Sequence, residues 1–298
     1  MAPTLYQERS RNTWRTVFLM TFFLAIVCGI GYFVAYYFQN PAFLYAAVFF
    51  AVFMNFYSYW FSDRQVLSMT NARPASREEF FDFYTVTENL SITAGIQMPK
   101  LYVVEDSSPN AFATGRNEKH AVVAATTGLL SMMTRPELEG VIAHELSHVR
   151  NRDILVMTIA VVLAGFLAII ADVFTRAAFW GGGRDDDNRG GNGIFIILGI
   201  VAVVLAPIAA QLIELAISRR REFQADASGA LLTRYPEGLA SALAKIESYG
   251  RPMQKVSHAT AHLFIGDPYG AHKQNWIDRL FSTHPPTADR IKALLGHS

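Results

Sequence analysis

The sequence predicts a mainly α-helical integral membrane protein, in which four apolar helices join a polar region that contains a small β-sheet. Hydrophobic residues make up 51% of the 298 residues and charged residues only 17%, and the mean hydropathy is +0.20. No charged residue occurs between Arg15 and Asp63. The composition and this long uncharged stretch together indicate a chain that sits in a bilayer.

Two membrane-spanning helices fit into the uncharged stretch, which is interrupted only by Gln39, Asn40 and Pro41. The first, residues 16–37, is longer than the apolar core of a secretory leader. It is followed directly by a second apolar segment, residues 41–61. We therefore expect a retained anchor rather than a cleaved leader.

Two further uncharged stretches, residues 154–171 and 190–213, are also long enough to cross the hydrocarbon core, which takes about 20 helical residues. The alternative is a hairpin buried inside the polar domain. Basic residues gather on one side of the four predicted spans, at Arg9, Arg11, Arg15, Arg150, Arg152 and residues 219–221. This asymmetry predicts that both termini and the polar regions lie in the cytoplasm, with the glycine-rich stretch 181–193 as an outer loop.

The polar segment between the second and third spans predicts one helix and a small sheet. Ser76 and Glu79 have the spacing of a capping box, which predicts a helix from there to Gly95. Residues 101–105 and 121–125 are rich in β-branched residues and predict short strands. Between them we expect an edge strand that binds an extended substrate backbone, and the alternative is an ordinary strand of the sheet. This predicted edge strand is formed by Asn110, Ala111, Phe112 and Ala113.

His144, Glu145 and His148 form the pattern H-E-x-x-H inside residues 136–149, whose apolar spacing predicts a helix. Thr134 and Glu137 have the spacing of a capping box that starts this helix. Positions four apart return to nearly the same helix face, so both imidazoles face one metal ion and Glu145 lies beside its water. The pattern indicates a zinc peptidase. The alternative, a chance match, is expected in about one such chain in a hundred.

A catalytic zinc takes three protein ligands and one water, so the two histidines predict a third donor elsewhere. Cys28 is the single cysteine and lies in an apolar stretch, which leaves a carboxylate or a further histidine. We favour Glu222 as the ligand, with Asp226 one turn later holding the imidazole of a ligand. The alternative is a solvated acidic face. His258 and His262 also lie four apart, but no acid stands beside them, which favours a surface or packing role.

Three segments, taken together and in order, resemble the HtpX family. They are the H-E-x-x-H motif, the run Ser-Arg-Arg-Arg-Glu-Phe-Gln-Ala-Asp at residues 218–226, and the run Phe-Ser-Thr-His-Pro-Pro-Thr-Ala-Asp-Arg-Ile at residues 281–291. Members of this family are bacterial integral membrane zinc endopeptidases of the gluzincin type, related to the CAAX prenyl proteases. The likeness covers nearly the whole chain, including the four apolar helices.

The resemblance implies one zinc ion bound by His144, His148 and Glu222, with Glu145 as the catalytic acid and base. His284 and Arg290 match family positions that contact the substrate or the transition state, although Arg290 is equally suited to pair with a structural carboxylate. The resemblance also implies a zincin-like catalytic domain on the cytoplasmic side of the bacterial inner membrane. There the chain would cleave misfolded or damaged membrane proteins in stress-related quality control. The partners implied are polypeptide substrates and the lipid bilayer, and we expect no nucleic acid.

The predicted organisation has four parts. Residues 1–62 hold the N-terminal tail and two spans, residues 63–152 the H-E-x-x-H motif, residues 153–217 two further spans and the outer loop, and residues 218–298 the third ligand. Because the ligands lie in the second and fourth parts, an even number of crossings must separate them. Two full crossings and a hairpin that only dips into the bilayer both meet this condition.

Three alternative functions stay open at this point. A zinc-stabilised scaffold without activity would be expected to lose the base, yet Glu145 is present. A transporter would be expected to carry more polar groups within its spans. A CAAX-type processing protease would use the same site. The residues favour a membrane endopeptidase in which Glu145 takes a proton from the attacking water.

Overall fold

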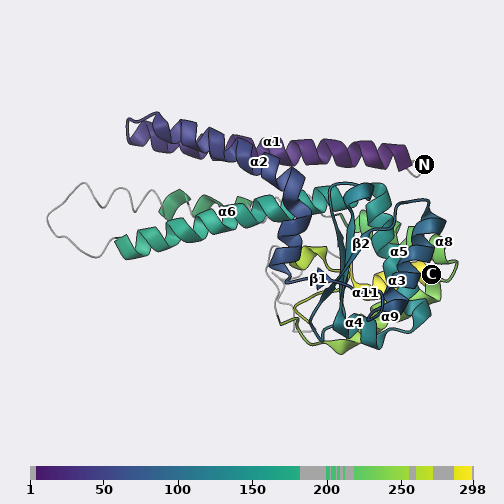
Figure 1. Cartoon of the computed structure of the whole chain (residues 1–298). Helices are drawn as coiled ribbons and strands as arrows, with labels where there is room; N and C mark the ends of the chain where they lie inside the picture. The colour runs from purple at the N-terminus through teal and green to yellow at the C-terminus, as the bar shows by residue number, and fades with distance from the viewer. Residues whose placement is uncertain are drawn as a thin grey trace.

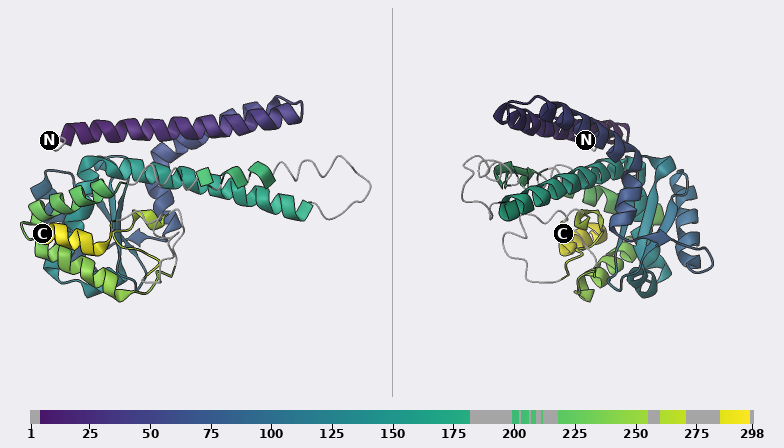
Figure 2. Two further views of the ribbon diagram at one scale, coloured as in Figure 1. Left: turned by 180° about the vertical axis from the view of Figure 1, so that it is seen from behind. Right: turned by 60° about the vertical axis from the view of Figure 1, so that its left-hand side comes forward.

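The computed structural model describes residues 5–181, 199–201, 203–205, 207, 208, 211, 218–254, 260–270 and 285–296. These residues are mostly helical and include one four-stranded sheet. Long helices extend away from the part that holds the sheet, and the N-terminus and the last helix lie at the same end of the molecule (Figures 1 and 2).

Among the described residues, three helices are long and apolar enough to cross a membrane: α1 (Leu5–Tyr37), α2 (Ala42–Met69) and α6 (Asp153–Gly181). In the most apolar windows of α1 and α2, 22% and 17% of the residues are buried, whereas 72% are buried in the window of α6. The helix α6 is therefore the central one, and α1 and α2 present apolar side chains that suit a lipid environment. Of the predicted fourth span, residues 190–213, the structure describes only residues 199–201, 203–205, 207, 208 and 211, which are helical, and most of the predicted outer loop lies outside the described residues.

The sheet has the strand order β1-β2-β4-β3, with β1 at Arg73–Pro74, β2 at Lys100–Val104, β3 at Ala111–Thr114 and β4 at Val122–Thr126. The strands β2 and β4 are parallel, and the other pairs are antiparallel. Successive residues point to opposite faces, and both faces are covered. Leu101, Val103 and Val123 pack with residues of the helix α5 (Arg135–Asn151), while Val104 and Ala124 pack with residues of α2 and α6. The sheet thus lies between α5 and most of α2 and α6, while the end of α5 meets α1 and the start of α6.

The predicted strands 101–105 and 121–125 are confirmed to within one residue by β2 and β4. The predicted edge strand is also found at a sheet edge, as β3, one residue further along the chain. The strand β1 was not predicted, because a two-residue strand that ends in proline gives no alternation.

The predicted start of the helix at Ser76 is wrong, because α3 spans Phe81–Ala94. The Ser76 hydroxyl does accept a hydrogen bond from the Glu79 N–H at 3.1 Å, so the capping pattern closes a separate turn. The carboxylate of Glu79 binds the guanidinium of Arg73 in β1, at 2.7 and 3.0 Å. This pairing ties the turn to the sheet and delays the helix. The predicted end is confirmed, because Gly95 caps α3 with a φ of 68°.

The helix α5 (Arg135–Asn151) lies at the centre of the polar part and begins with the predicted capping box. The Glu137 carboxylate accepts from the Thr134 N–H at 2.8 Å and from Lys245 at 2.7 Å. Burial alone would raise the pKa of Glu137, but hydrogen bonds from Lys245 and Ser241 lower it to about 2. The helices α3, α8 (Arg219–Thr233) and α9 (Pro236–Tyr249) pack against α5, and α11 (Thr287–Leu295) packs on α8 and α9. The short helices α4, η1 and η2 occupy Thr127–Met132, Glu118–His120 and Ala261–Leu263.

Gly140 allows α5 and α9 to touch. A Cβ atom at this position would lie 2.6 Å from the Leu239 nitrogen and 2.7 Å from its Cα atom. We expect Gly140→Ala to force the two helix backbones apart and to lower the free energy of unfolding by about 1–3 kcal/mol. Thermal unfolding of the full chain in detergent measures this effect. The control is Gly29→Ala, where nothing lies within 4 Å, and equal melting temperatures for both variants would contradict the prediction.

Candidate metal centre

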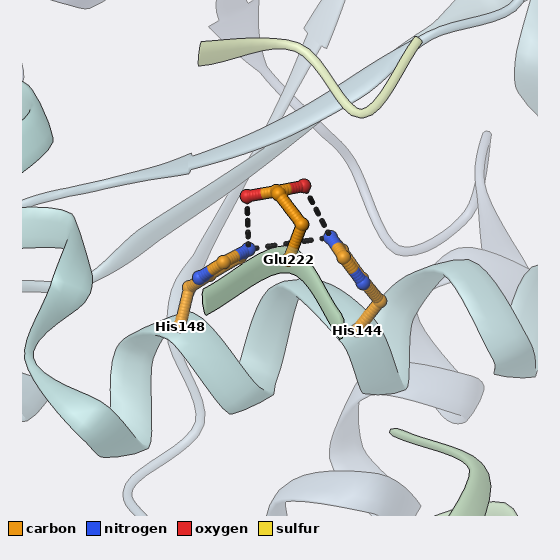
Figure 3. A group of neighbouring side chains, drawn as sticks. All are labelled: His144, His148 and Glu222. Carbon is orange, nitrogen blue, oxygen red and sulfur yellow. Dashed lines mark hydrogen bonds and ion pairs between the residues drawn. The ribbon is translucent and has the colours of Figure 1, made fainter. Parts of the chain in front are cut away.

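Two imidazoles from α5 and one carboxylate from α8 converge on one point (Figure 3). The Nε2 atoms of His144 and His148 lie 3.2 Å apart. The Glu222 oxygens lie 3.9 Å from Nε2 of His144 and 3.6 Å from Nε2 of His148. All three side chains are buried. Among the described residues, this is the one group of three whose donor atoms have the spacing of a metal site.

The approach of α8 to α5 depends on Gly229, which lies on α8 after Glu222. A Cβ atom on Gly229 would lie 3.0 Å from the His144 nitrogen and 3.2 Å from the Ala143 carbonyl carbon. The absence of a side chain there lets the α8 backbone rest against α5. The helix spacing on α5 then brings both imidazoles to the side that faces Glu222.

Each imidazole pairs with a carboxylate through its Nδ1 atom. Nδ1 of His144 lies 2.9 Å from the carboxylate of Asp226, which follows Glu222 by one turn. Nδ1 of His148 lies 3.2 Å from Asp153, at the start of α6. A carboxylate accepts the Nδ1 proton, so Nε2 of each ring keeps its lone pair and points to the common centre.

The donor set fits a zinc ion. Four ligands at about 2.0–2.1 Å in a tetrahedron stand about 3.3 Å from one another, and the separations of 3.2, 3.6 and 3.9 Å are close to this value. When no metal ion is bound, a proton on Nε2 of His148 occupies the short contact between the Nε2 atoms of His144 and His148, and a metal ion would take the place of that proton. Two imidazoles and one carboxylate are a ligand set that catalytic zinc uses.

The electrostatics of the cluster favour positive charge. Burial raises the pKa of Glu145 to about 7. Burial would lower the pKa of His148, but the hydrogen bond to Asp153 and the nearby Glu222 outweigh burial and raise it to about 9. The imidazole of His144 has a lowered pKa, chiefly because it is buried. The carboxylates around the rings thus create a field that attracts a cation.

Glu145 lies between the two histidines in the chain and is itself buried, with 2% of its surface exposed. A backbone hydrogen bond from Ala113 in β3 partly offsets the effect of burial on its pKa. The Glu145 side chain is therefore set between the metal-site histidines and the edge strand. This is the position that a base needs if a substrate backbone lies along β3.

The backbone carbonyl groups at the start of the edge strand accept hydrogen bonds from two sides, from β4 and from the segment 260–270. The Asn110 carbonyl accepts from Thr126 in β4, and the outward-facing Ala111 carbonyl accepts from Ile265 at 2.9 Å. The Asn110 amide also binds both backbone groups of Gly266 at 3.0 Å. Phe112 packs edge-on against Phe264, with ring centroids 5.2 Å apart. Asn110 to Phe112 thus hold the segment 260–270, and the backbone of Ala113 lies nearest to Glu145.

Arg290 reaches the centre from α11. Its guanidinium makes a two-pronged contact with Asp226 at 2.8 and 2.7 Å and donates to the Ile265 carbonyl at 3.0 Å. Burial would raise the pKa of Asp226, but the hydrogen bonds from Arg290 and His144 lower it to about 2. Arg290 therefore keeps Asp226 charged while Asp226 holds His144. The predicted contact residue His284 lies outside the described residues, as does His258.

Sequence reasoning did not identify Asp153. Its Oδ1 atom accepts from the Asn12 amide at 2.6 Å, its Oδ2 atom meets His148, and the Arg221 guanidinium lies 3.6 Å away. The sequence feature that could have identified Asp153 is its position as the first residue of an apolar helix, five positions after His148. Asn12 belongs to α1 and is distant in the chain, so nothing in the sequence connects it to the site. The contact joins a membrane helix to a ligand of the candidate metal centre.

Removing the charge of Asp153 should weaken metal binding. We expect Asp153→Asn to lower the zinc affinity about 10–100-fold, because the His148 tautomer is no longer fixed by a carboxylate. Competition with a chromophoric chelator measures the affinity without relying on activity. Asp267→Asn is the control, because Asp267 lies in the segment 260–270 and outside the cluster. Equal affinities for both variants would show that Asp153 does not position His148.

Comparison with known proteins gives three findings. Residues 79–298 match the model of peptidase family M48. The chain is 46% identical over 295 residues to a protein named Protease HtpX homolog from Thermoanaerobacter pseudethanolicus, which covers 98% of this chain and 97% of that protein. It is 49% identical over 282 residues to a protein of the same name from Pyrococcus furiosus, with 94% of each covered.

Among solved structures, the crystal structure of S. mikatae Ste24p matches with a TM-score of 0.51 at 20% sequence identity. The match covers 93% of this chain and 62% of that chain. The chain therefore spans less than two thirds of this neighbour. At this level of identity, the likeness concerns the fold alone.

Proposed function

The chain belongs to peptidase family M48, and from this premise we propose that His144, His148 and Glu222 bind one zinc ion and that Glu145 is the acid and base of peptide hydrolysis. The protein is a membrane metalloprotease, as the family, the nearly full-length relatives and the apolar helices indicate. The observation that supports the residue assignment is the convergence of three buried donor atoms from α5 and α8 at separations suited to one tetrahedral ion.

The chain's own residues supply the proton transfers. When bound, zinc supplies a Lewis acid that polarises a carbonyl group and lowers the pKa of water to about 7. Glu145 takes the proton of the attacking water and then delivers it to the leaving amine. Asp226 and Asp153 keep the two imidazoles oriented, and Arg290 keeps Asp226 in place. Arg290 thus acts through Asp226, while His284 stays the predicted contact with the substrate or the transition state.

An extended polypeptide is the substrate class that suits β3. We infer that the substrate backbone adds along the outer edge at Ala113, next to Glu145, where main-chain hydrogen bonds place few demands on the sequence. Ala111 already bonds to Ile265, so the edge available to the substrate is short. A short edge suits unfolded segments, and we propose misfolded or damaged membrane proteins as natural substrates.

The membrane arrangement completes the proposal. We propose four spans, the fourth at residues 190–213, and a catalytic site that faces the cytoplasm from the bacterial inner membrane. The four predicted regions, 1–62, 63–152, 153–217 and 218–298, then alternate between membrane and catalytic parts. Support comes from the N-terminus and α11 lying at one end of the molecule, while the far ends of α1 and α6 lie at the other (Figure 1).

Cleavage of an unfolded protein tests the function. We expect the full chain, purified in detergent and loaded with zinc, to cleave fluorescently labelled casein. A chelator should stop the release of fluorescent peptides, and added zinc should restore it. The same rate with and without the chelator would contradict metal-dependent hydrolysis.

A further inference from the structure

A pocket of about 550 Å³ lies between the C-terminal half of α2 and the sheet. Phe56, Trp60 and Phe61 form an aromatic wall, and Arg64, Lys100 and Arg116 bring positive charge. Tyr102 of β2 lines the same pocket and packs with the cluster on the α2 side of the sheet. The helix α5 packs on the other side. The pocket is therefore separate from the candidate metal centre.

The pocket lies where α2 passes from an apolar span to the polar part. Phe56 and Trp60 are 57% and 43% exposed, so the wall is open to the surroundings. Asp63 is the first charged residue after Arg15 in the chain. Aromatic side chains followed by the first charged residues mark the level of the lipid headgroups. A lipid molecule beside α2 thus has its headgroup at the height of Arg64.

A column of aromatic rings runs along α2 towards the pocket. The rings of Phe49, Phe53, Tyr57 and Phe61 follow one another at centroid distances of 6.3, 5.9 and 5.3 Å. The Arg64 guanidinium lies 5.6 Å from the last ring. Phe49 and Phe53 are exposed. A lipid whose acyl chain lies along this column has its headgroup at the positively charged end of the pocket.

Arg116 is already held in a fixed position. Its guanidinium lies 4.5 Å from the Trp60 ring centroid, donates to the Trp60 carbonyl at 3.1 Å and contacts Nε2 of His120 at 2.8 Å. Two of its five N–H groups are used in this way. The remaining donors are preorganised for an acceptor, so binding costs little side-chain entropy.

The charges of the pocket favour an anion. The pocket is lined by three permanent cations and one carboxylate, that of Asp63. In the part of the chain that the structure describes, no ion pair joins Arg64, Lys100 or Arg116 to a carboxylate. Guanidinium groups bind phosphate oxygens through two parallel hydrogen bonds. A phosphate group is the anion that the surrounding bilayer supplies.

We propose that this pocket binds an anionic phospholipid, with its phosphate between Arg64, Lys100 and Arg116 and one acyl chain along the aromatic column of α2. This site goes beyond the proposed function and does not depend on it. Because α2 covers the sheet that carries β3, the bound lipid fixes the depth at which the catalytic part sits on the membrane.

Native mass spectrometry of the full chain tests the proposal without any assay of activity. The protein in detergent is incubated with equal amounts of palmitoyl-oleoyl-phosphatidylglycerol and palmitoyl-oleoyl-phosphatidylcholine. We expect the wild type to retain the anionic lipid at least about fivefold better than the zwitterionic one. Lys100→Gln and Arg116→Gln should each lower retention of phosphatidylglycerol by about fivefold. Equal retention of both lipids by the wild type overturns the proposal.

The matched control is Lys119→Gln, which removes a charge close to Arg116 in the chain from an exposed residue that does not line the pocket. Equal losses of phosphatidylglycerol retention in Lys119→Gln and Lys100→Gln would show that the lipid binds by general electrostatic attraction to the surface. This result would overturn the proposed lipid site. Arg116→Lys keeps the charge and should retain more lipid than Arg116→Gln. If the Arg116 variants fail to fold, the exposed Lys100 decides the outcome alone. Displacement of the lipid by millimolar inorganic phosphate would identify a site for free phosphate and would also overturn the proposal.

Discussion

Replacing Glu222 with alanine is expected to lower the zinc affinity by more than about a hundredfold. The carboxylate is the one member of the candidate cluster that comes from outside α5, and its oxygens lie within 3.9 Å of both Nε2 atoms. Without it the two imidazoles hold the ion alone, and a buried dication loses the negative charge that offsets it. Competition with a chelator, read as zinc bound per chain, measures the loss.

Histidine variants outside the cluster provide the comparison for Glu222→Ala. We expect His258→Ala and His262→Ala to keep zinc affinity near that of the wild type. Glu222→Asp keeps the charge but shortens the side chain by one methylene, and it should fall between the wild type and Glu222→Ala. If all of these variants lose zinc equally, the ligand assignment is wrong.

The sequence predicts the metal cluster better than it predicts the structure around it. The spacing of His144, Glu145 and His148 on one helix predicts two ligands and a base, and the same spacing of Glu222 and Asp226 on a second helix favours them as the third ligand and its carboxylate neighbour. The distances between these helices depend on Gly229, whose role appears only when α8 meets α5. Packing of this kind is set by tertiary contacts, and a single sequence does not reveal it.

Sequence reasoning missed polar contacts that follow neither the helix nor the strand period. Asp153 contacts His148 from five positions later, at the start of the next helix, and binds Asn12 of α1, which is 141 positions away. The start of α3 was wrong for a related reason, because the ion pair of Glu79 with Arg73 stabilises a turn where local signals predict a helix. Periodic patterns therefore predict the candidate residues, while polar contacts outside those periods determine how the residues are held.

Glu145→Gln should reduce casein cleavage by about 10²–10⁴-fold while leaving zinc bound. Glutamine keeps the size of the side chain and has no carboxylate to take a proton from water. Zinc binding should persist because the donor atoms belong to His144, His148 and Glu222. The rate of peptide release and the zinc content are measured on the same sample, so a lost ion is distinguished from a lost base.

Glu139→Gln is the matched control for Glu145→Gln, because Glu139 lies on the same helix, pairs with Arg135 at 3.4 Å and has a side chain that is 39% exposed. It should cleave casein at the wild-type rate. If Glu145→Gln retains zinc and cuts as fast as Glu139→Gln, another group must accept the proton of the attacking water. The assignment of Glu145 as the base would then be wrong. The inference that the substrate backbone adds at Ala113 of β3 would lose its support, because it rests on Glu145 lying next to Ala113.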